Sequence, residues 1–161
     1  MGSEMCIRDS RERARQATAG HDRARLRIDA IPGDEPTVTV TSALLPSHVR
    51  LRPVIVPGGL GAHKWRDRTL LAAHEADDPA AMPLLLDADG LVLETSRASV
   101  VIRAHDGRLY TPPADGRILP GVTAAHAQAR PRAVTLDDLE SARELYVASA
   151  LRGLQPARLA G

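Results

Sequence analysis

Lysine chemistry in this chain depends on one residue. Of the 21 lysine and arginine side chains, 20 are arginine, and Lys64 is the only lysine. A side-chain amine can act as a nucleophile or a base, whereas a guanidinium stays protonated and forms no productive imine at neutral pH. Any reaction that needs a lysine amine therefore has to use Lys64.

The other reactive side chains do not form a recognisable metal or disulfide pattern. The six histidines lack the spacing of metal ligands, and His63, beside Lys64, is interpreted as structural. The single cysteine, Cys6, excludes an intramolecular disulfide and a cysteine-based zinc site, and it favours a reducing cytoplasmic location. A net charge of +1 and the absence of an 18-residue apolar stretch predict neither nucleic acid nor membrane as a partner.

The elements that must position Lys64 are typical of an α+β domain with short strands and few helices. Alternation over 25–41, with a turn at 31–36, predicts an antiparallel hairpin, and residues 54–56 predict a short strand that ends at Pro57. A helical pattern follows over 64–75. Further strands are expected at 84–86, 91–93, 99–104, 109–111 and 145–147, and helices at 124–129 and 135–143, the latter capped by Thr135 and Asp138.

The N-terminal segment of the chain differs in character from the rest. Residues 1–10 show no periodicity, and residues 11–27 are polar and rich in arginine. We therefore predict a poorly structured leader over 1–24 and a single domain over 25–161.

Six segments resemble, in order, the class IV aminotransferase family, which includes branched-chain and D-amino acid aminotransferases and aminodeoxychorismate lyases. They are Gly61–Arg68, Leu84–Gly90, Val92–Ser99, Asp106–Pro113, Ile118–Thr123 and Ala148–Pro156. The resemblance implies a D-amino acid aminotransferase-like fold, of which this chain would hold an incomplete cofactor-binding domain. It also implies the cofactor pyridoxal 5′-phosphate and a small-molecule amino substrate.

Two residues would carry the family's chemistry. Lys64 resembles the lysine that holds the cofactor as a Schiff base, and a desolvated amine there can also move the proton of the substrate Cα. Glu94 resembles the carboxylate that pairs with the pyridine nitrogen of the cofactor. That pairing keeps the ring protonated, so the ring can withdraw electrons.

Two turns would hold the cofactor phosphate. Gly121, Val122 and Thr123 resemble the family's phosphate-binding turn, where backbone N–H groups at a helix start and a hydroxyl suit a dianion. Ser149 and Ala150 resemble a second loop that faces the phosphate and the substrate carboxylate.

The stretch Lys64–Arg68 is more similar to the lyase branch, because branched-chain transaminases have tyrosine where this chain has Thr69. Arg152–Pro156 also suits the lyase side. The implied reaction converts 4-amino-4-deoxychorismate to 4-aminobenzoate and pyruvate, in folate biosynthesis. The alternatives are a branched-chain or D-amino acid aminotransferase and an inactive remnant of such an enzyme.

Three departures from the family matter. Nothing in residues 1–20 resembles the small N-terminal domain, which supplies an arginine to the cofactor phosphate. Ala124 stands where the family usually has arginine, and residues 124–134 are too few for the family's longer helix and strand. The chain therefore resembles a fragment or decayed copy with weak activity or none, whose complete parent would be a homodimer.

Overall fold

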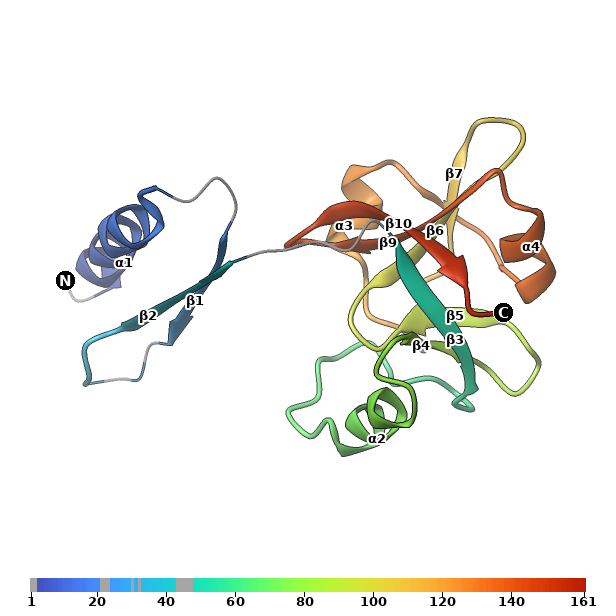
Figure 1. Ribbon diagram of the computed structural model, residues 1–161, viewed down its shortest axis with the longest axis horizontal. Coiled ribbons are helices and arrows are strands. Elements are labelled where there is room, and N and C mark those ends of the chain that lie inside the picture. The colour runs from blue at the N-terminus through green and yellow to red at the C-terminus, as the bar shows by residue number, and fades with distance from the viewer. Residues whose placement is uncertain (1–2, 21–23, 30, 32, 43–47) are drawn as a thin grey trace. The chain divides into compact units, whose positions relative to one another are not determined.

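The computed structural model describes residues 3–20, 24–29, 31, 33–42 and 48–161, and the chain divides into two compact units (Figure 1). Unit 1 spans Met1–Pro46 and unit 2 spans Ser47–Gly161. The boundary differs from the predicted one after residue 24, because the hairpin after that residue makes its contacts with the helix that precedes it.

Unit 1 consists of helix α1 (Ser3–Thr18) and the strands β1 (Ala24–Asp29) and β2 (Thr37–Ser42). The strands pair antiparallel, as predicted, with Asp29 opposite Thr37; part of the predicted turn, residues 30 and 32, lies outside the described residues. The helix occupies most of the segment predicted to be a poorly structured leader. Polar contacts stabilise it: Glu12 accepts a hydrogen bond from Gln16, four residues on, and Arg13 pairs with Glu35 at 3.1 Å.

Unit 2 is a curled sheet of eight strands in the order β5-β4-β3-β10-β9-β6-β7-β8 (Figure 1). The strands are β3 (Val49–Ile55), β4 (Met82–Leu86), β5 (Val92–Thr95), β6 (Ser99–Arg103), β7 (Leu109–Thr111), β8 (Arg130–Pro131), β9 (Glu144–Ser149) and β10 (Gly153–Leu159). The helices are α2 (Thr69–Asp77), α3 (Val122–His126) and α4 (Leu136–Ser141). The N–H of Val92 in β5 donates a hydrogen bond to the carbonyl of Val134 at 2.7 Å. This bond connects the edge strand β5 with the segment that follows the opposite edge strand, β8.

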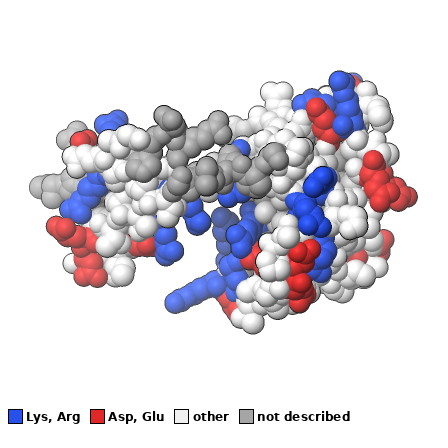
Figure 2. All heavy atoms as spheres, in the orientation of Figure 1, with Lys and Arg blue, Asp and Glu red and all other residues white. Residues whose placement is uncertain are grey.

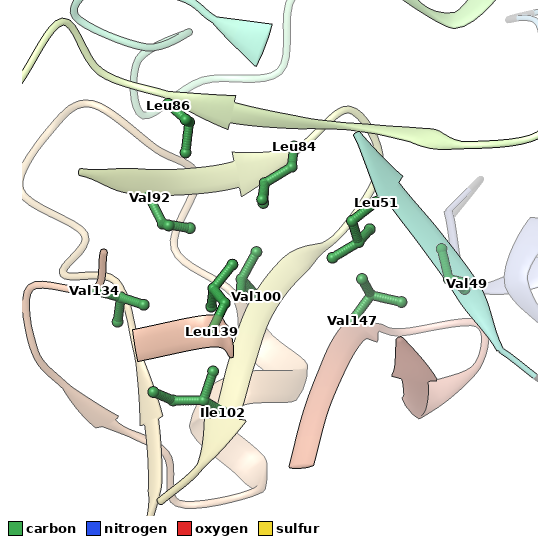
Figure 3. Packing of buried hydrophobic residues seen from close by; sticks show 10 residues of the cluster. All are labelled: Val49, Leu51, Leu84, Leu86, Val92, Val100, Ile102, Val134, Leu139 and Val147. Atoms are coloured by element: carbon green, nitrogen blue, oxygen red, sulfur yellow. The ribbon is translucent and has the colours of Figure 1, made fainter. Parts of the chain in front are cut away.

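The main core lies inside this curl (Figure 3). Ten buried side chains from five strands, from α4 and from the segment before α4 point toward one another: Val49, Leu51, Leu84, Leu86, Val92, Val100, Ile102, Val134, Leu139 and Val147. Because side chains alternate along a strand, the same strands also supply a second face, where Leu85 and Leu93 pack with Leu71 of α2.

Several predicted boundaries shift in unit 2. The helix expected from Lys64 begins only at Thr69, because the carboxylate of Asp67 accepts hydrogen bonds from the Thr69 N–H and hydroxyl at 2.8 and 2.6 Å. Strands β8 and β10 were not predicted. The capping box at Thr135 and Asp138 is confirmed, and both of its reciprocal hydrogen bonds are present.

Candidate active site

The loop from Asp115 to Gly121 connects the segments that carry the predicted site residues. Its Arg117 carbonyl accepts hydrogen bonds from the N–H groups of Leu60 and Gly61, at 3.1 and 3.0 Å. The chain there runs so close that a Cβ on Gly59 would lie 2.3 Å from the same carbonyl oxygen. Gly59 also has φ +67°, a conformation that favours glycine. These contacts fix the start of the loop that contains Lys64.

Lys64 itself is exposed, between β3 and α2. The indole of the next residue, Trp65, donates a hydrogen bond to the Leu60 carbonyl at 2.6 Å, and Asp67 binds Thr69 at the other end of the loop. The loop is therefore held on both sides of the lysine. The desolvation expected for a reactive amine is not provided by the described residues of unit 2.

Glu94 in β5 is the buried carboxyl group of the site. It is 6% exposed, and burial raises its pKa to about 7, although a hydrogen bond from the backbone N–H of Leu119 works in the opposite direction. Among the residues that the structure describes, no arginine, lysine or histidine forms an ion pair with it. The carboxyl can therefore accept a proton or a cationic group that the chain does not supply.

The predicted phosphate turn begins helix α3. Gly121 is the N-cap, and its carbonyl receives the first helical hydrogen bond, from Ala125 at 3.0 Å. The N–H groups of Val122 and Thr123 precede that bond and have no acceptor within the helix. Gly121 lies against β6, since a Cβ there would be 2.2 Å from the Ser99 hydroxyl oxygen.

The second predicted turn adjoins the first. Ser149 ends β9, and Ala150 is exposed in the turn to β10. Ala124 and Ala148 pack together in one buried cluster, and each is the sequence neighbour of a predicted site residue, Thr123 and Ser149. The structure thus brings both turns together, and it links them to Glu94 through Leu119 and to the Lys64 loop through Arg117.

A cavity of about 510 Å³ borders α3. It shares Gly121 and Val122 with the predicted site, but the other predicted site residues do not line it. Its remaining wall comes mainly from the 111–120 segment, α3 and β8. This is the region in which the sequence predicted a missing length of helix, and α3 is indeed only five residues long.

Sequence reasoning missed two residues that hold the site together, Asp87 and Arg117. Asp87 lies in the segment Leu84–Gly90 that resembles the family but received no role, yet its carboxylate accepts the Gly58 N–H at 2.8 Å and pairs with Arg117 at 2.6 Å. The only sign of this contact in the sequence is the presence of two opposite charges. Asp87 and Arg117 are 30 residues apart, and no local pattern predicts that they pair. Figure 2 shows charged side chains of both signs next to one another on the visible face of unit 2.

Arg97, three residues after Glu94, is engaged elsewhere. Its guanidinium bonds both carboxylate oxygens of Glu75 at 2.9 and 2.6 Å, and this hydrogen bonding lowers the pKa of Glu75 to about 2. Among the described residues, no group of histidine, cysteine, aspartate and glutamate side chains could hold a metal ion. None of the described helices is long and apolar enough to cross a membrane.

Comparisons with known proteins show the family and the fold of the chain. The family described as Amino-transferase class IV matches residues 16–160. A comparison with curated protein sequences found no match. A Mesorhizobium loti structure, described as a proposed amino-acid aminotransferase, is 28% identical with a TM-score of 0.73, over 93% of this chain and 80% of that one.

Two further structures share the fold. A hypothetical aminotransferase from Mycobacterium tuberculosis, in its PLP-bound form, is 23% identical with a TM-score of 0.68, over 96% of this chain and 67% of that one. A 4-amino-4-deoxychorismate lyase from Pseudomonas aeruginosa is 20% identical with a TM-score of 0.58, over 84% of this chain and 62% of that one. The chain therefore spans less than two thirds of the lyase, and the predicted fold class is confirmed.

Proposed function

Because the chain belongs to the class IV aminotransferase family, we propose that it binds pyridoxal 5′-phosphate and acts as a lyase or transaminase through Lys64. When bound, this cofactor supplies a ring that withdraws electrons from the substrate Cα. The observation that carries the proposal is Glu94, a buried carboxyl with a pKa of about 7 and no ion-pair partner among the described residues. Such a group suits a ring nitrogen that has to keep its proton.

The other predicted residues have matching roles. The Lys64 amine would hold the cofactor aldehyde covalently and move a proton at the substrate Cα. The free N–H groups of Val122 and Thr123, together with the Thr123 hydroxyl, would bind the phosphate dianion. Ser149 and Ala150 lie beside that turn, where they would face the phosphate and the substrate carboxylate.

A second copy of the chain would cover the exposed side of the site. Trp65, Val122 and Leu151 are large apolar residues with exposed fractions of 65%, 66% and 55%, and each directly neighbours a predicted site residue in sequence. Exposed large apolar side chains favour a protein interface. A homodimer would thereby supply the desolvation that Lys64 lacks, and light scattering of the purified chain tests it.

The reaction we favour is that of an aminodeoxychorismate lyase, which releases pyruvate and 4-aminobenzoate. Its support is the sequence: the stretch Lys64–Arg68 followed by Thr69, and the segment Arg152–Pro156. An amino acid aminotransferase is the second candidate, favoured by the similarity to the Mesorhizobium loti structure. The exposed Lys64 and the five-residue α3 favour a third, an inactive remnant.

The decisive experiment is reductive trapping. The purified chain is titrated with pyridoxal 5′-phosphate, reduced with borohydride and digested, and the peptides are analysed by mass spectrometry. Because Lys64 is the only lysine, an added phosphopyridoxyl group can sit only there or on the N-terminal amine. We expect saturable labelling of the Lys64 peptide.

The control is Lys64→Arg, which keeps the charge and the N-terminal amine but removes the side-chain amine. Labelling confined to the N-terminus of both proteins would refute the proposal and favour the inactive remnant. If Lys64 is labelled, product analysis separates the two reactions: pyruvate with 4-aminobenzoate identifies the lyase, and a new keto acid with a new amino acid identifies the transaminase.

A further inference from the structure

Asp87 and Arg117 occupy a position between the two halves of the candidate site. Asp87 follows β4, and one of its carboxylate oxygens accepts the N–H of Gly58, in the turn that leads to Lys64, at 2.8 Å. Its other oxygen pairs with the Arg117 guanidinium at 2.6 Å. These two side chains are only 14% and 28% exposed, so the pair is partly protected from solvent.

Arg117 also holds the same loop through its main chain. Its carbonyl accepts the N–H groups of Leu60 and Gly61, while two residues further on the Leu119 N–H reaches Glu94. Arg117 is thus connected to three parts of the candidate site. Its side chain binds the turn after β4, and its carbonyl binds the Lys64 loop. Two residues further along the chain, the Leu119 N–H reaches Glu94.

We propose that Asp87 and Arg117 form a clasp that sets the position of the Lys64 loop relative to Glu94. Asp87 holds the loop at Gly58, and Arg117 holds it at Leu60 and Gly61, so three residues that precede Lys64 are fixed from two directions. Neither residue reacts; both are positioning residues. The consequence at Lys64 rests on the proposed function, whereas the clasp itself does not.

The clasp has a partner that serves as a matched control. Arg117 binds Asp115 as well, with Nη2 2.7 Å from its carboxylate, but among the described residues Asp115 bonds nothing in the Lys64 loop. Both carboxylates therefore pair with the same guanidinium, and only Asp87 also reaches Gly58. Losing Asp115 removes one charge pair and the hydrogen bond that its carboxylate accepts from the Arg117 backbone N–H at 3.2 Å, and it leaves the link from Asp87 to Gly58 intact.

Trp65 is a reporter inside the loop. It is the only tryptophan, and its indole N–H donates to the Leu60 carbonyl at 2.6 Å. A ¹H–¹⁵N NMR spectrum of the chain without cofactor therefore holds one indole signal, whose position depends on that hydrogen bond. In Asp87→Ala and Arg117→Met we expect this signal to move toward that of a free indole, and in Asp115→Ala to stay in place.

Conservative variants separate positioning from general stability. Asp87→Asn still accepts the Gly58 N–H but loses its charge toward Arg117, so its indole signal should fall between those of the parent and Asp87→Ala. Thermal unfolding of each variant identifies any that fails to fold. An indole signal that stays in place in folded Asp87→Ala and Arg117→Met, or moves equally in Asp115→Ala, would overturn the clasp.

Labelling of Lys64 gives a second readout. With pyridoxal 5′-phosphate and borohydride, we expect several-fold slower labelling in Asp87→Ala than in Asp115→Ala. If the indole signal moves but the parent chain is not labelled at Lys64, the clasp stands and the proposed function fails. If the parent is labelled and folded Asp87→Ala matches it in both signal and labelling rate, the clasp fails and the proposed function stands.

Discussion

The backbone N–H of Leu119 donates a hydrogen bond to the buried carboxyl group of Glu94. Leu119 lies two residues before Gly121, where the predicted phosphate turn begins. A pyridine ring and its phosphate are fixed in one cofactor, so a protein that binds both has to hold its two anchoring groups at a constant separation. Under the proposed function, this hydrogen bond and the close approach of Gly121 to Ser99 would perform that task.

Glu94 should make the stability of the cofactor-free chain depend on pH. Its pKa is about 7 in the folded chain against 4.5 for an ordinary glutamate, so the folded state binds the proton more tightly than the unfolded state. The favourable contribution is fully present below about pH 4.5 and is lost as the pH rises through about 7. The shift corresponds to roughly 3 kcal/mol in the free energy of unfolding.

Urea unfolding at pH 5 and pH 8 measures this effect, with Glu94→Gln as the informative variant. The amide still accepts the Leu119 N–H but cannot ionise, so its stability should lack this pH-dependent loss. Glu140→Gln, at an exposed position of α4, should retain the loss seen in the parent. Equal pH dependence in the parent and Glu94→Gln would contradict the assigned pKa.

The sequence identified the elements whose signals are local. The hairpin of unit 1, strand β7 and the Thr135 cap follow from alternation and from side-chain-to-backbone bonding over a few residues. Helix α1 was missed because its supports are ion pairs and hydrogen bonds, one of them to the hairpin, and not an apolar stripe. Strand β10 was missed because it contains Pro156, which weakens a strand pattern.

The sequence named candidate site residues but gave no information on the connections between them. Resemblance supplied Lys64, Glu94 and the turn at Gly121, and Glu94 is buried as a ring-binding carboxyl requires. The clasp of Asp87 and Arg117 depends on two charges that meet only after the sheet has formed. The exposure of Lys64 was not predicted either, because the sequence pattern predicted a helix that starts at this residue.

The Thr135 cap should contribute measurably to the stability of unit 2. Its hydroxyl accepts the N–H of Asp138 at 3.2 Å, and α4 buries Leu139 in the main core. Thr135→Ala should lower the free energy of unfolding by about 1 kcal/mol, whereas Thr135→Ser, which keeps the hydroxyl, should lower it far less. Urea unfolding compares the two, and equal losses would show that the hydroxyl is not the stabilising group.

Gly121 should resist substitution because of Ser99. A Cβ at Gly121 would lie 2.2 Å from the Ser99 hydroxyl oxygen and 3.1 Å from its Cβ. We expect Gly121→Ala to cost roughly 1–3 kcal/mol through overpacking, and Ser99→Ala to relieve part of that cost in the double variant. Urea unfolding of the four proteins in this cycle gives the coupling, and strictly additive losses would show that the two residues do not clash.

Gly59 offers the strictest test of how the Lys64 loop is packed, since the neighbouring Gly58 supplies a matched control. Both glycines have positive φ, +75° at Gly58 and +67° at Gly59, so alanine at either position is strained by about 1–2 kcal/mol. A Cβ at Gly58 meets nothing within 4 Å, whereas one at Gly59 meets the Arg117 carbonyl oxygen at 2.3 Å. That oxygen is backbone, already bonded by Leu60 and Gly61, and cannot rotate away.

Gly59→Ala should therefore destabilise the chain by clearly more than Gly58→Ala, roughly 3 kcal/mol or above in urea unfolding. Because the clash displaces the carbonyl that holds the loop, the Trp65 indole signal should move in Gly59→Ala and move less in Gly58→Ala. Equal stabilities would mean that the loop lies further from Arg117 than the structure places it. Unequal stabilities with an unmoved indole signal would mean that the loop adapts to the clash without shifting Lys64.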